Sequence, residues 1–296
     1  MADWQDLFVT AADGLKLHVR AFGSAEATGL PVVCLPGLSR SSADFEELAI
    51  ALATSAVRPR QVFALDYRGR GQSDYDKNPA NYALSVEVAD LITVLSSLNI
   101  ARAVFVGTSR GGILTMLLAT LRPEAIAGVV LNDIGPVIEP AGLMRIKGYV
   151  GKLPTPSSFE DGAEILRRLG EAQFPKLKSE DWLRQAKRTW TEKSGEFVLL
   201  YDPALAATLQ DFDPEKPVPD LWAQFDALAE KPLMIIRGAN SDILSAKTIE
   251  AMRARRASYT EAIEVPDQGH APLLVEPGII KQIENFVGHC EKNATL

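Results

Sequence analysis

A serine at position 109 stands in a setting that could make it a nucleophile. It is the centre of a Gly-x-Ser-x-Gly run at residues 107–111. The apolar residues 103–106 predict a strand before it, and residues 113–119 predict a helix after it. A sharp strand-to-helix turn exposes the serine hydroxyl, and glycines leave room there for neighbouring chain. The pattern therefore predicts that Ser109 is a nucleophile; the alternative is a glycine-rich packing turn with an incidental serine.

A nucleophilic serine needs a base, and the chain contains only three histidines. His18 falls in a predicted hairpin near the N-terminus, and His289 lies near the C-terminus. His270 lies in a loop between the last predicted strand and the last predicted helix. Such loops meet at the carboxyl edge of a parallel sheet, where ligands bind. Context and elimination both indicate that His270 is the base.

A third group must orient the imidazole and offset its developing charge. Asp242 follows a predicted strand at residues 232–237 and precedes His270 by one helix and one strand. Asp133 also follows a predicted strand and is a rival. Sequence analysis favours Asp242 as the acid and leaves Asp133 to cap or orient the start of the segment that follows it. The chain order is then Ser, Asp, His.

The oxyanion of a tetrahedral intermediate needs two N–H donors. The residue after the nucleophile, Arg110, supplies one backbone amide. The loop after the apolar run 31–35 is expected to supply the other, from Leu38, with Gly37 and Ser39 as neighbours that could substitute. The alternative for this loop is a simple Pro-Gly turn.

These residues need a scaffold, and the remaining sequence predicts one. Residues 7–20 predict a β-hairpin through their alternation and an Asp-Gly turn. After it, short apolar runs alternate with amphipathic helical stretches. That rhythm predicts an α/β fold with a mostly parallel sheet covered on both faces.

The alternation of short apolar runs and helical stretches stops between residues 136 and 229. This stretch has prolines, helical patterns and three of the four tryptophans, but no clear strand. We expect a helical cap inserted after the sixth strand, over the carboxyl edge of a core formed by residues 1–135 and 230–296. The alternative is an independent second domain. Its aromatic residues are candidates for a substrate-binding wall or for the cap's own core: Tyr149, Phe174, Trp182, Trp190 and Trp222.

Composition excludes several other classes. The net charge of −7 and the lack of a basic stripe argue against a nucleic-acid partner. The two cysteines, Cys34 and Cys290, cannot form a disulfide scaffold or a cysteine metal site. The N-terminus does not read as a signal peptide, and no apolar run approaches the roughly 20 residues that span a bilayer. We expect a cytoplasmic protein that does not bind membranes.

Several motifs together resemble the α/β-hydrolase superfamily. They are the serine turn at 107–112, the stretch 65–74, the stretch 237–242 and Gly-His-Ala-Pro at 269–272. The resemblance covers nearly the whole chain outside the insertion and implies the fold of that family, an eight-stranded, mostly parallel sheet with flanking helices. The most similar members are cap-bearing bacterial hydrolases, among them carboxylesterases, enol-lactonases and meta-cleavage C–C hydrolases. The resemblance implies acyl transfer to water without a cofactor. We also expect no metal site, and a monomer or homodimer.

Two departures from that pattern bear on function. Many relatives have His-Gly where this chain has Pro36-Gly37, which leaves the choice of oxyanion donor open. The large side chain of Arg110 either meets a buried carboxylate of the protein or holds an anionic group of the substrate. We expect a serine hydrolase that cleaves a small ester or lactone through Ser109. The alternatives are a C–C hydrolase, for which Arg110 would bind an anion, and a ligand-binding homologue without turnover.

Overall fold

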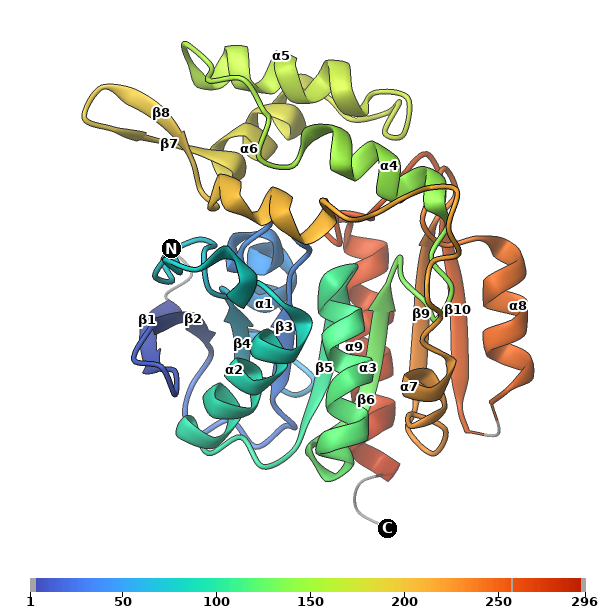
Figure 1. Ribbon diagram of the computed structural model, residues 1–296. Coiled ribbons are helices and arrows are strands. Elements are labelled where there is room, and N and C mark those ends of the chain that lie inside the picture. The colour runs from blue at the N-terminus through green and yellow to red at the C-terminus, as the bar shows by residue number, and fades with distance from the viewer. Residues whose placement is uncertain (1–3, 257, 294–296) are drawn as a thin grey trace.

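The computed structural model describes residues 4–256 and 258–293 and is built around an eight-stranded sheet (Figure 1). Its strands are β1 (Trp4–Thr10), β2 (Lys16–Phe22), β3 (Val32–Leu35), β4 (Val62–Leu65), β5 (Ala103–Thr108), β6 (Ile126–Asn132), β9 (Leu233–Gly238) and β10 (Thr260–Val265). They lie in the order β1-β2-β4-β3-β5-β6-β9-β10. β1 and β4 pair antiparallel with β2, and every other neighbouring pair is parallel. The predicted hairpin and mostly parallel sheet are confirmed.

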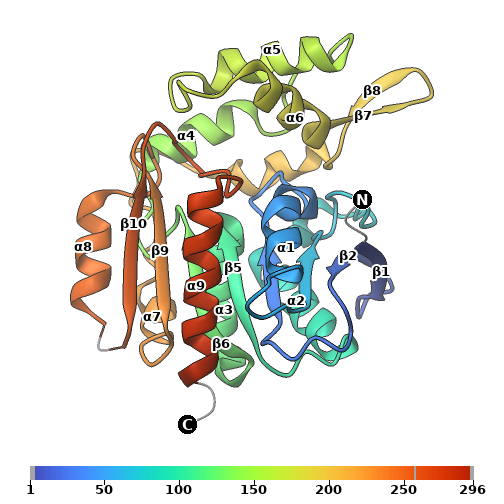
Figure 2. The same ribbon diagram turned by 180° about the vertical axis from the view of Figure 1, so that it is seen from behind.

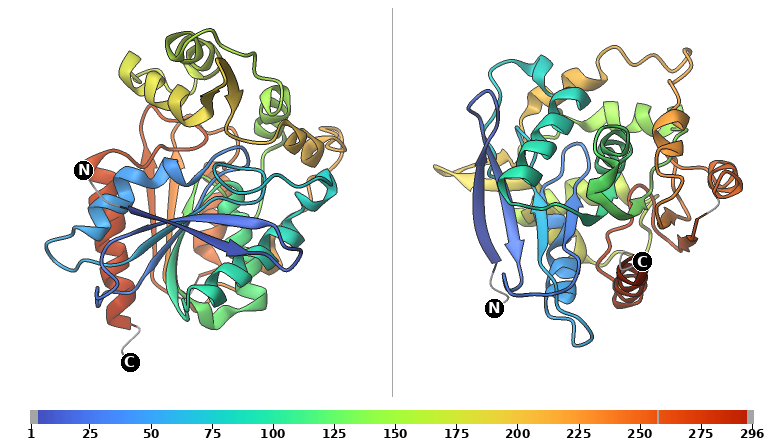
Figure 3. Two further views of the ribbon diagram at one scale, coloured as in Figure 1. Left: turned by 90° about the vertical axis from the view of Figure 1, so that its left-hand side faces the viewer. Right: turned by 90° about the horizontal axis from the view of Figure 1, so that it is seen from below.

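Three inner strands of the sheet, β3, β4 and β6, are buried along their whole length. Each of these strands is apolar almost throughout. Such continuous apolar runs are what a strand covered on both faces requires, because side chains point alternately to the two faces. The hairpin of β1 and β2 forms one edge of the twisted sheet (Figure 3).

Helices cover both faces of the sheet. On one face α1 (Glu46–Ala53) and α9 (Pro277–Asn293) pack on the strands, as the rear view shows (Figure 2). The other face carries α2 (Leu84–Ser97), α3 (Arg110–Leu121), α7 (Trp222–Asp226) and α8 (Ala246–Ala254). Short 3-10 helices lie at Ser42–Phe45, Pro79–Asn81, Pro123–Ala125 and Pro203–Leu209. No helix within the described residues is both long enough and apolar enough to cross a membrane.

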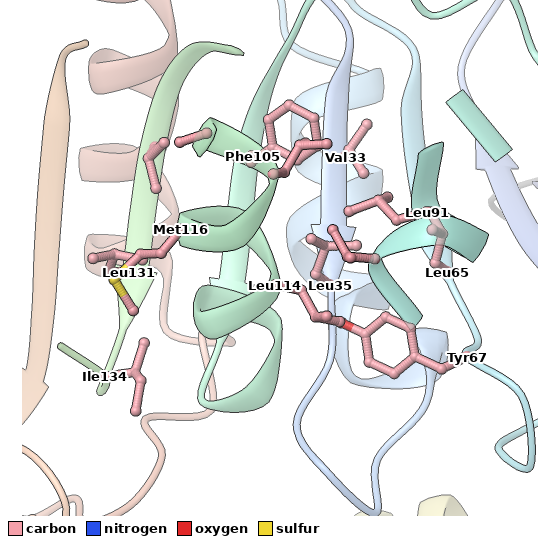
Figure 4. Close-up of a cluster of buried hydrophobic side chains, with 14 of the residues drawn as sticks. Val33, Leu35, Leu65, Tyr67, Leu91, Phe105, Leu114, Met116, Leu131 and Ile134 are labelled. Atoms are coloured by element: carbon pink, nitrogen blue, oxygen red, sulfur yellow. The ribbon is translucent and has the colours of Figure 1, made fainter. Parts of the chain in front are cut away.

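The larger core fills the space between the sheet and the helices α2 and α3. Phe105 and Leu131 from the strands meet Leu114 and Met116 from α3, and all of them are fully buried (Figure 4). Burying a large aliphatic or aromatic side chain contributes about 1.5–3 kcal/mol. This packing fixes α3 against β5, and with it the turn between them that carries Ser109.

The segment of residues 136–229, which we call the insertion, connects β6 to β9. Its main elements are α4 (Pro140–Tyr149), α5 (Phe159–Gly170), α6 (Ser179–Thr189), β7 (Trp190–Lys193) and β8 (Glu196–Leu199). They lie above the sheet edge where the parallel strands end (Figures 1 and 2). The antiparallel hairpin of β7 and β8 corrects the prediction that this stretch has no strand. α7, at the end of the insertion, packs against α3 on the flank of the sheet instead.

Candidate active site

Ser109 occupies the sharp turn between β5 and α3. Its backbone has φ 51° and ψ −114°, a strained conformation for a residue with a side chain. The positions two residues before and two residues after Ser109 must be glycine, because neighbouring backbone leaves no room for a side chain there. A Cβ on Gly107 would lie 2.6 Å from the Gly111 backbone, and one on Gly111 would lie 2.1 Å from the Leu35 carbonyl oxygen. The chain around Ser109 is therefore packed so tightly that the serine is held at one position with its hydroxyl outward.

His270 reaches the serine from the loop after β10. Its Nε2 lies 2.8 Å from Ser109 Oγ, a hydrogen-bond distance. The loop is held from two sides. The His270 amide donates to Oε1 of Gln173, in the insertion, at 3.1 Å, and Asn132 Nδ2 donates to the Pro272 carbonyl at 2.9 Å. The structure therefore brings together the two residues that sequence analysis paired.

The carboxylate beside His270 belongs to Asp133, directly after β6. Asp133 Oδ2 lies 2.8 Å from His270 Nδ1, and the aspartate side chain is fully buried. Two further donors hold the carboxylate: the Gly238 amide at 2.8 Å and the Ser241 hydroxyl at 2.5 Å. An acceptor on Nδ1 fixes the tautomer whose Nε2 can accept the serine proton.

The prediction that Asp242 is the partner of His270 is wrong. Asp242 instead forms a bidentate ion pair with Arg145 of α4. Arg145 Nε lies 2.6 Å from Asp242 Oδ2, and Arg145 Nη2 lies 2.9 Å from Asp242 Oδ1. β6 lies next to β5, the strand that carries Ser109, whereas β9 is one strand further away. Strand order does not decide between the two aspartates, because β9 is the direct neighbour of β10, whose following loop carries His270. The contacts decide: the Asp133 carboxylate lies 2.8 Å from His270 Nδ1, whereas the Asp242 carboxylate is held by Arg145. Both aspartates keep the order Ser, Asp, His, so chain order could not separate them.

The predicted oxyanion loop lies beside the serine. Gly37, Leu38 and Ser39 all line the same cavity as Ser109. Arg70 Nε donates to the Leu38 carbonyl at 2.8 Å and fixes that turn. The Arg110 amide is the first of α3, where N–H groups have no acceptor within the helix. Both predicted donors thus belong to segments that border Ser109.

The Arg110 side chain points away from the cavity into a buried ion-pair cluster. Its Nε donates to Glu87 Oε2 at 2.5 Å, and its Nη2 donates to the Tyr82 carbonyl at 2.7 Å. Glu87 is fully buried and accepts a second guanidinium, from Arg70, at 2.7 Å. Of the two predicted roles for this side chain, the structure supports contact with a buried carboxylate.

A cavity of about 220 Å³ lies between Ser109 and the insertion. Tyr149 and Trp182 are on its wall, as is Phe174. Most of the wall is aliphatic or aromatic; its leucine and isoleucine members are Leu38, Ile146, Leu153, Leu166, Leu169, Leu177, Leu273 and Leu274. Trp190 is instead 1% exposed and packs beside Gly162 of α5, so its prediction as a substrate-binding residue is wrong.

A family model described as the alpha/beta hydrolase family matches residues 32–279. The chain belongs to the alpha/beta hydrolase family. It is 34% identical over 288 residues to the 3-hydroxybutyrate-oligomer hydrolase of Cupriavidus necator, across 94% of this chain and 96% of that protein. It is 26% identical to the 2-(acetamidomethylene)succinate hydrolase of Mesorhizobium japonicum, across 92% of both. The crystal structure of an alpha/beta hydrolase from Novosphingobium aromaticivorans has a TM-score of 0.89 and 40% identity, covering 97% of this chain and 99% of that one.

The cavity of this alpha/beta hydrolase also carries charged residues that sequence analysis missed. Arg40, Arg145 and Arg188 line it together with a single acid, Asp44. Arg40 directly follows the predicted oxyanion loop and binds Asp44, while its Nη2 also donates to Gln185 of α6 at 2.6 Å. No local motif marks these arginines, because they come from separate elements and meet only in the folded hydrolase.

A second histidine of the hydrolase is also flanked by carboxylates, away from the cavity. His18 of β2 is fully buried, with Nδ1 2.7 Å from Asp66 and Nε2 2.8 Å from Asp6. Burial lowers its pKa, but the hydrogen bonds to Asp66 and Asp6 outweigh burial and raise the pKa overall. His18 therefore ties the N-terminal hairpin to the turn after β4, in line with the structural role expected from its sequence position.

Proposed function

We propose that this protein is a serine hydrolase that cleaves a carboxylic ester of a small molecule through an acyl-enzyme on Ser109. The observation that carries the proposal is the unbroken hydrogen-bonded chain from Ser109 Oγ through His270 to Asp133. That arrangement is the one that activates a serine in hydrolases of several folds.

In the first half of the reaction, Ser109 Oγ attacks the ester carbonyl while His270 Nε2 takes the hydroxyl proton. The carbonyl oxygen becomes an oxyanion that accepts hydrogen bonds from the amides of Leu38 and Arg110. Asp133 stabilises the imidazolium that forms. The carbon–oxygen bond to the alcohol then breaks, and His270 gives its proton to the departing alcohol oxygen.

In the second half, water enters the place of the alcohol. His270 takes a proton from the water as its oxygen attacks the acyl carbon of the acyl-enzyme. The second tetrahedral intermediate uses the same two amides. Ser109 Oγ leaves with the proton from His270, and the acid product is released, so the enzyme returns to its starting state.

The substrate we propose is a short oligoester of a hydroxy acid, with a lactone as the related cyclic form. The cavity of about 220 Å³ holds a few small acyl units, and its mostly apolar wall suits their carbon skeleton. The relative from Cupriavidus necator, which matches along nearly its whole length, carries the name of an oligomer hydrolase for 3-hydroxybutyrate. We further propose that the elements from α4 to β8 act as a cap that closes this cavity.

The two alternative functions have less support. A C–C hydrolase would use Arg110 to bind an anionic group of the substrate. The Arg110 side chain instead forms an ion pair with Glu87. A binding protein without turnover would have no need for a serine, a histidine and a buried carboxylate in hydrogen-bond contact.

The test is hydrolysis of p-nitrophenyl butyrate by the wild type, by Ser109→Ala and by Ser97→Ala. Ser97 is an exposed serine at the end of α2 and serves as the matched control. We expect turnover in the wild type and the control, a loss of about 10³-fold or more in Ser109→Ala, and labelling of Ser109 by a fluorophosphonate. Undiminished turnover in Ser109→Ala, or label on another residue, would refute the proposal.

A further inference from the structure

We infer that Arg145 anchors a carboxylate carried by the alcohol portion of the ester substrate. The inference rests on the proposed function and narrows its substrate class to acyloxy carboxylic acids, in which the leaving alcohol bears a negative charge. Arg145 is then a specificity-determining residue, and Asp242 is the residue that positions it.

The charges on the cavity wall support an anionic substrate. Three arginines line the cavity against one acid, although the chain as a whole has a net charge of −7. The carboxylates of Asp242 and Glu47, which pair with Arg145 and Arg188, are not part of the wall. A ligand in the cavity therefore meets the guanidinium groups of Arg145 and Arg188, whose partner carboxylates are not on the wall.

Among the three arginines, Arg145 is the one with room for a ligand. Arg188 is 9% exposed and directs its Nη2 to Glu47. Arg40 uses Nε, Nη1 and Nη2 on Asp44, Gln185 and Thr189. The side chain of Arg145 is 29% exposed, and its ion pair with Asp242 uses Nε and Nη2. Its remaining side-chain partner is the hydroxyl of Tyr149, which lines the same cavity. The guanidinium is thus already oriented, which lowers the entropy cost of binding a carboxylate.

The position of Asp242 places Arg145 on the side where the alcohol leaves. Asp242 directly follows Ser241, whose hydroxyl donates to Asp133, the carboxylate that contacts His270. In the proposed mechanism, His270 is the group that protonates the departing alcohol. The Asp242 carbonyl also accepts a hydrogen bond from the Gly142 amide of α4 at 3.1 Å, which fixes α4 and Arg145 beside this loop. A carboxylate a few bonds beyond the ester oxygen can therefore meet Arg145.

The experiment compares two esters of nearly the same shape, 3-(butanoyloxy)butanoate, which carries a carboxylate, and 3-(butanoyloxy)butanamide, which carries a neutral amide in its place. Release of butyrate gives kcat/KM for each, and the ratio of the two values is the readout. A charge-assisted hydrogen bond is worth a factor of about 10–100, so we expect the wild type to prefer the carboxylate by that factor. We expect the ratio to fall to about 1 in Arg145→Gln.

Two further variants separate binding from indirect effects. In Arg145→Gln the unpaired Asp242 could repel the substrate, whereas Arg145→Gln/Asp242→Asn removes both charges. If Arg145 binds the carboxylate, the double variant still shows no preference; a restored preference would overturn the inference. Arg168→Gln is the matched control, because Arg168 lies on α5 of the insertion with a side chain 72% exposed. Its ratio should equal that of the wild type.

The inference and the proposed function can fail separately. A wild-type ratio near 1, with turnover that still depends on Ser109, would refute the carboxylate site alone. Butyrate release that survives Ser109→Ala would refute the nucleophile alone. Calorimetric binding of both esters to Ser109→Ala decides the carboxylate site without turnover: tighter binding of the carboxylate, lost in Ser109→Ala/Arg145→Gln, supports it, and equal binding overturns it.

Discussion

Asp133 and His270 are 137 residues apart in the chain, yet Asp133 Oδ2 and His270 Nδ1 lie within 2.8 Å of each other. The contact joins the end of β6 to the loop after β10, with β9 between those two strands in the sheet. β9 and the loop after it take part as well, since the amide of Gly238, the last residue of β9, and the hydroxyl of Ser241 donate hydrogen bonds to the same carboxylate. One buried aspartate thus contacts both the loop after β9 and the loop that carries His270.

The first prediction distinguishes the two candidate acids. Asp133→Asn should lower kcat for p-nitrophenyl butyrate by about 10³–10⁴-fold, because the amide favours the wrong imidazole tautomer. Asp242→Asn should cause a loss at least about a hundredfold smaller, since the Asp242 carboxylate pairs with Arg145 and Asp133 is the acceptor at His270 Nδ1. Steady-state kinetics of both variants provide the check. A larger loss in Asp242→Asn would reverse the assignment.

The second prediction concerns the packing around the serine turn. Gly111→Ala should destabilise the fold by about 3 kcal/mol or more, because the new methyl group would lie 2.1 Å from the Leu35 carbonyl oxygen. Gly148→Ala is the control: a Cβ at this position in α4 meets nothing within 4 Å. Alanine should stabilise that helix by about 0.5–1 kcal/mol. Urea unfolding measures both, and equal effects would contradict the packing argument.

The third prediction addresses the buried cluster beneath Arg110. Glu87→Gln should cost about 3–5 kcal/mol, because it leaves two buried guanidinium groups, Arg70 and Arg110, without their carboxylate. Glu124→Gln removes an exposed carboxylate that also pairs with an arginine. That control should unfold at the same urea concentration as the wild type. A Glu87→Gln protein as stable as the control would show that the cluster contributes little.

The fourth prediction is a pH dependence of stability. The contacts with Asp66 and Asp6 raise the pKa of His18 in the folded state, so protonated His18 stabilises the fold. This contribution is fully present below the unfolded pKa of about 6.5 and is lost as pH rises through the folded-state pKa. The stability difference between wild type and His18→Gln should therefore be larger at pH 5.5 than at pH 9. Urea titrations at both values test it, and a difference independent of pH would exclude the effect.

The sequence predicted the parts of the site whose signal is local. Ser109 is marked by adjacent glycines, and His270 stood out because the chain has few histidines. Asp133 is only a rival in the sequence, because both aspartates follow a strand and precede His270, and only the folded contact with His270 Nδ1 separates them. Arg145 carries no local signal, since its role depends on how α4 lies over the β9 loop. The roles of such residues depend on contacts that form only in the folded chain.

The same distinction explains the errors in the insertion. The hairpin of β7 and β8 turns at Ser194 and Gly195, both with positive φ, so a local turn signal was present and overlooked. The error for Trp190 has a different cause, because the sequence contains no local signal that separates a pocket residue from a core residue. Its aromatic character is compatible with a pocket wall or with a core, and only the packing of α5 against it decides for the core.

Gln173 joins the insertion to the loops after β9 and β10. Its side chain accepts a hydrogen bond from the His270 amide, and its backbone carbonyl accepts one from Asn240 Nδ2. The part of the chain that lines the cavity therefore also holds the loop of His270. A chimaera in which a foreign segment replaces residues 136–229 would lose both hydrogen bonds of Gln173, even if its new pocket were well formed. Redesign of this protein for another ligand must treat selectivity and the placement of His270 as one problem.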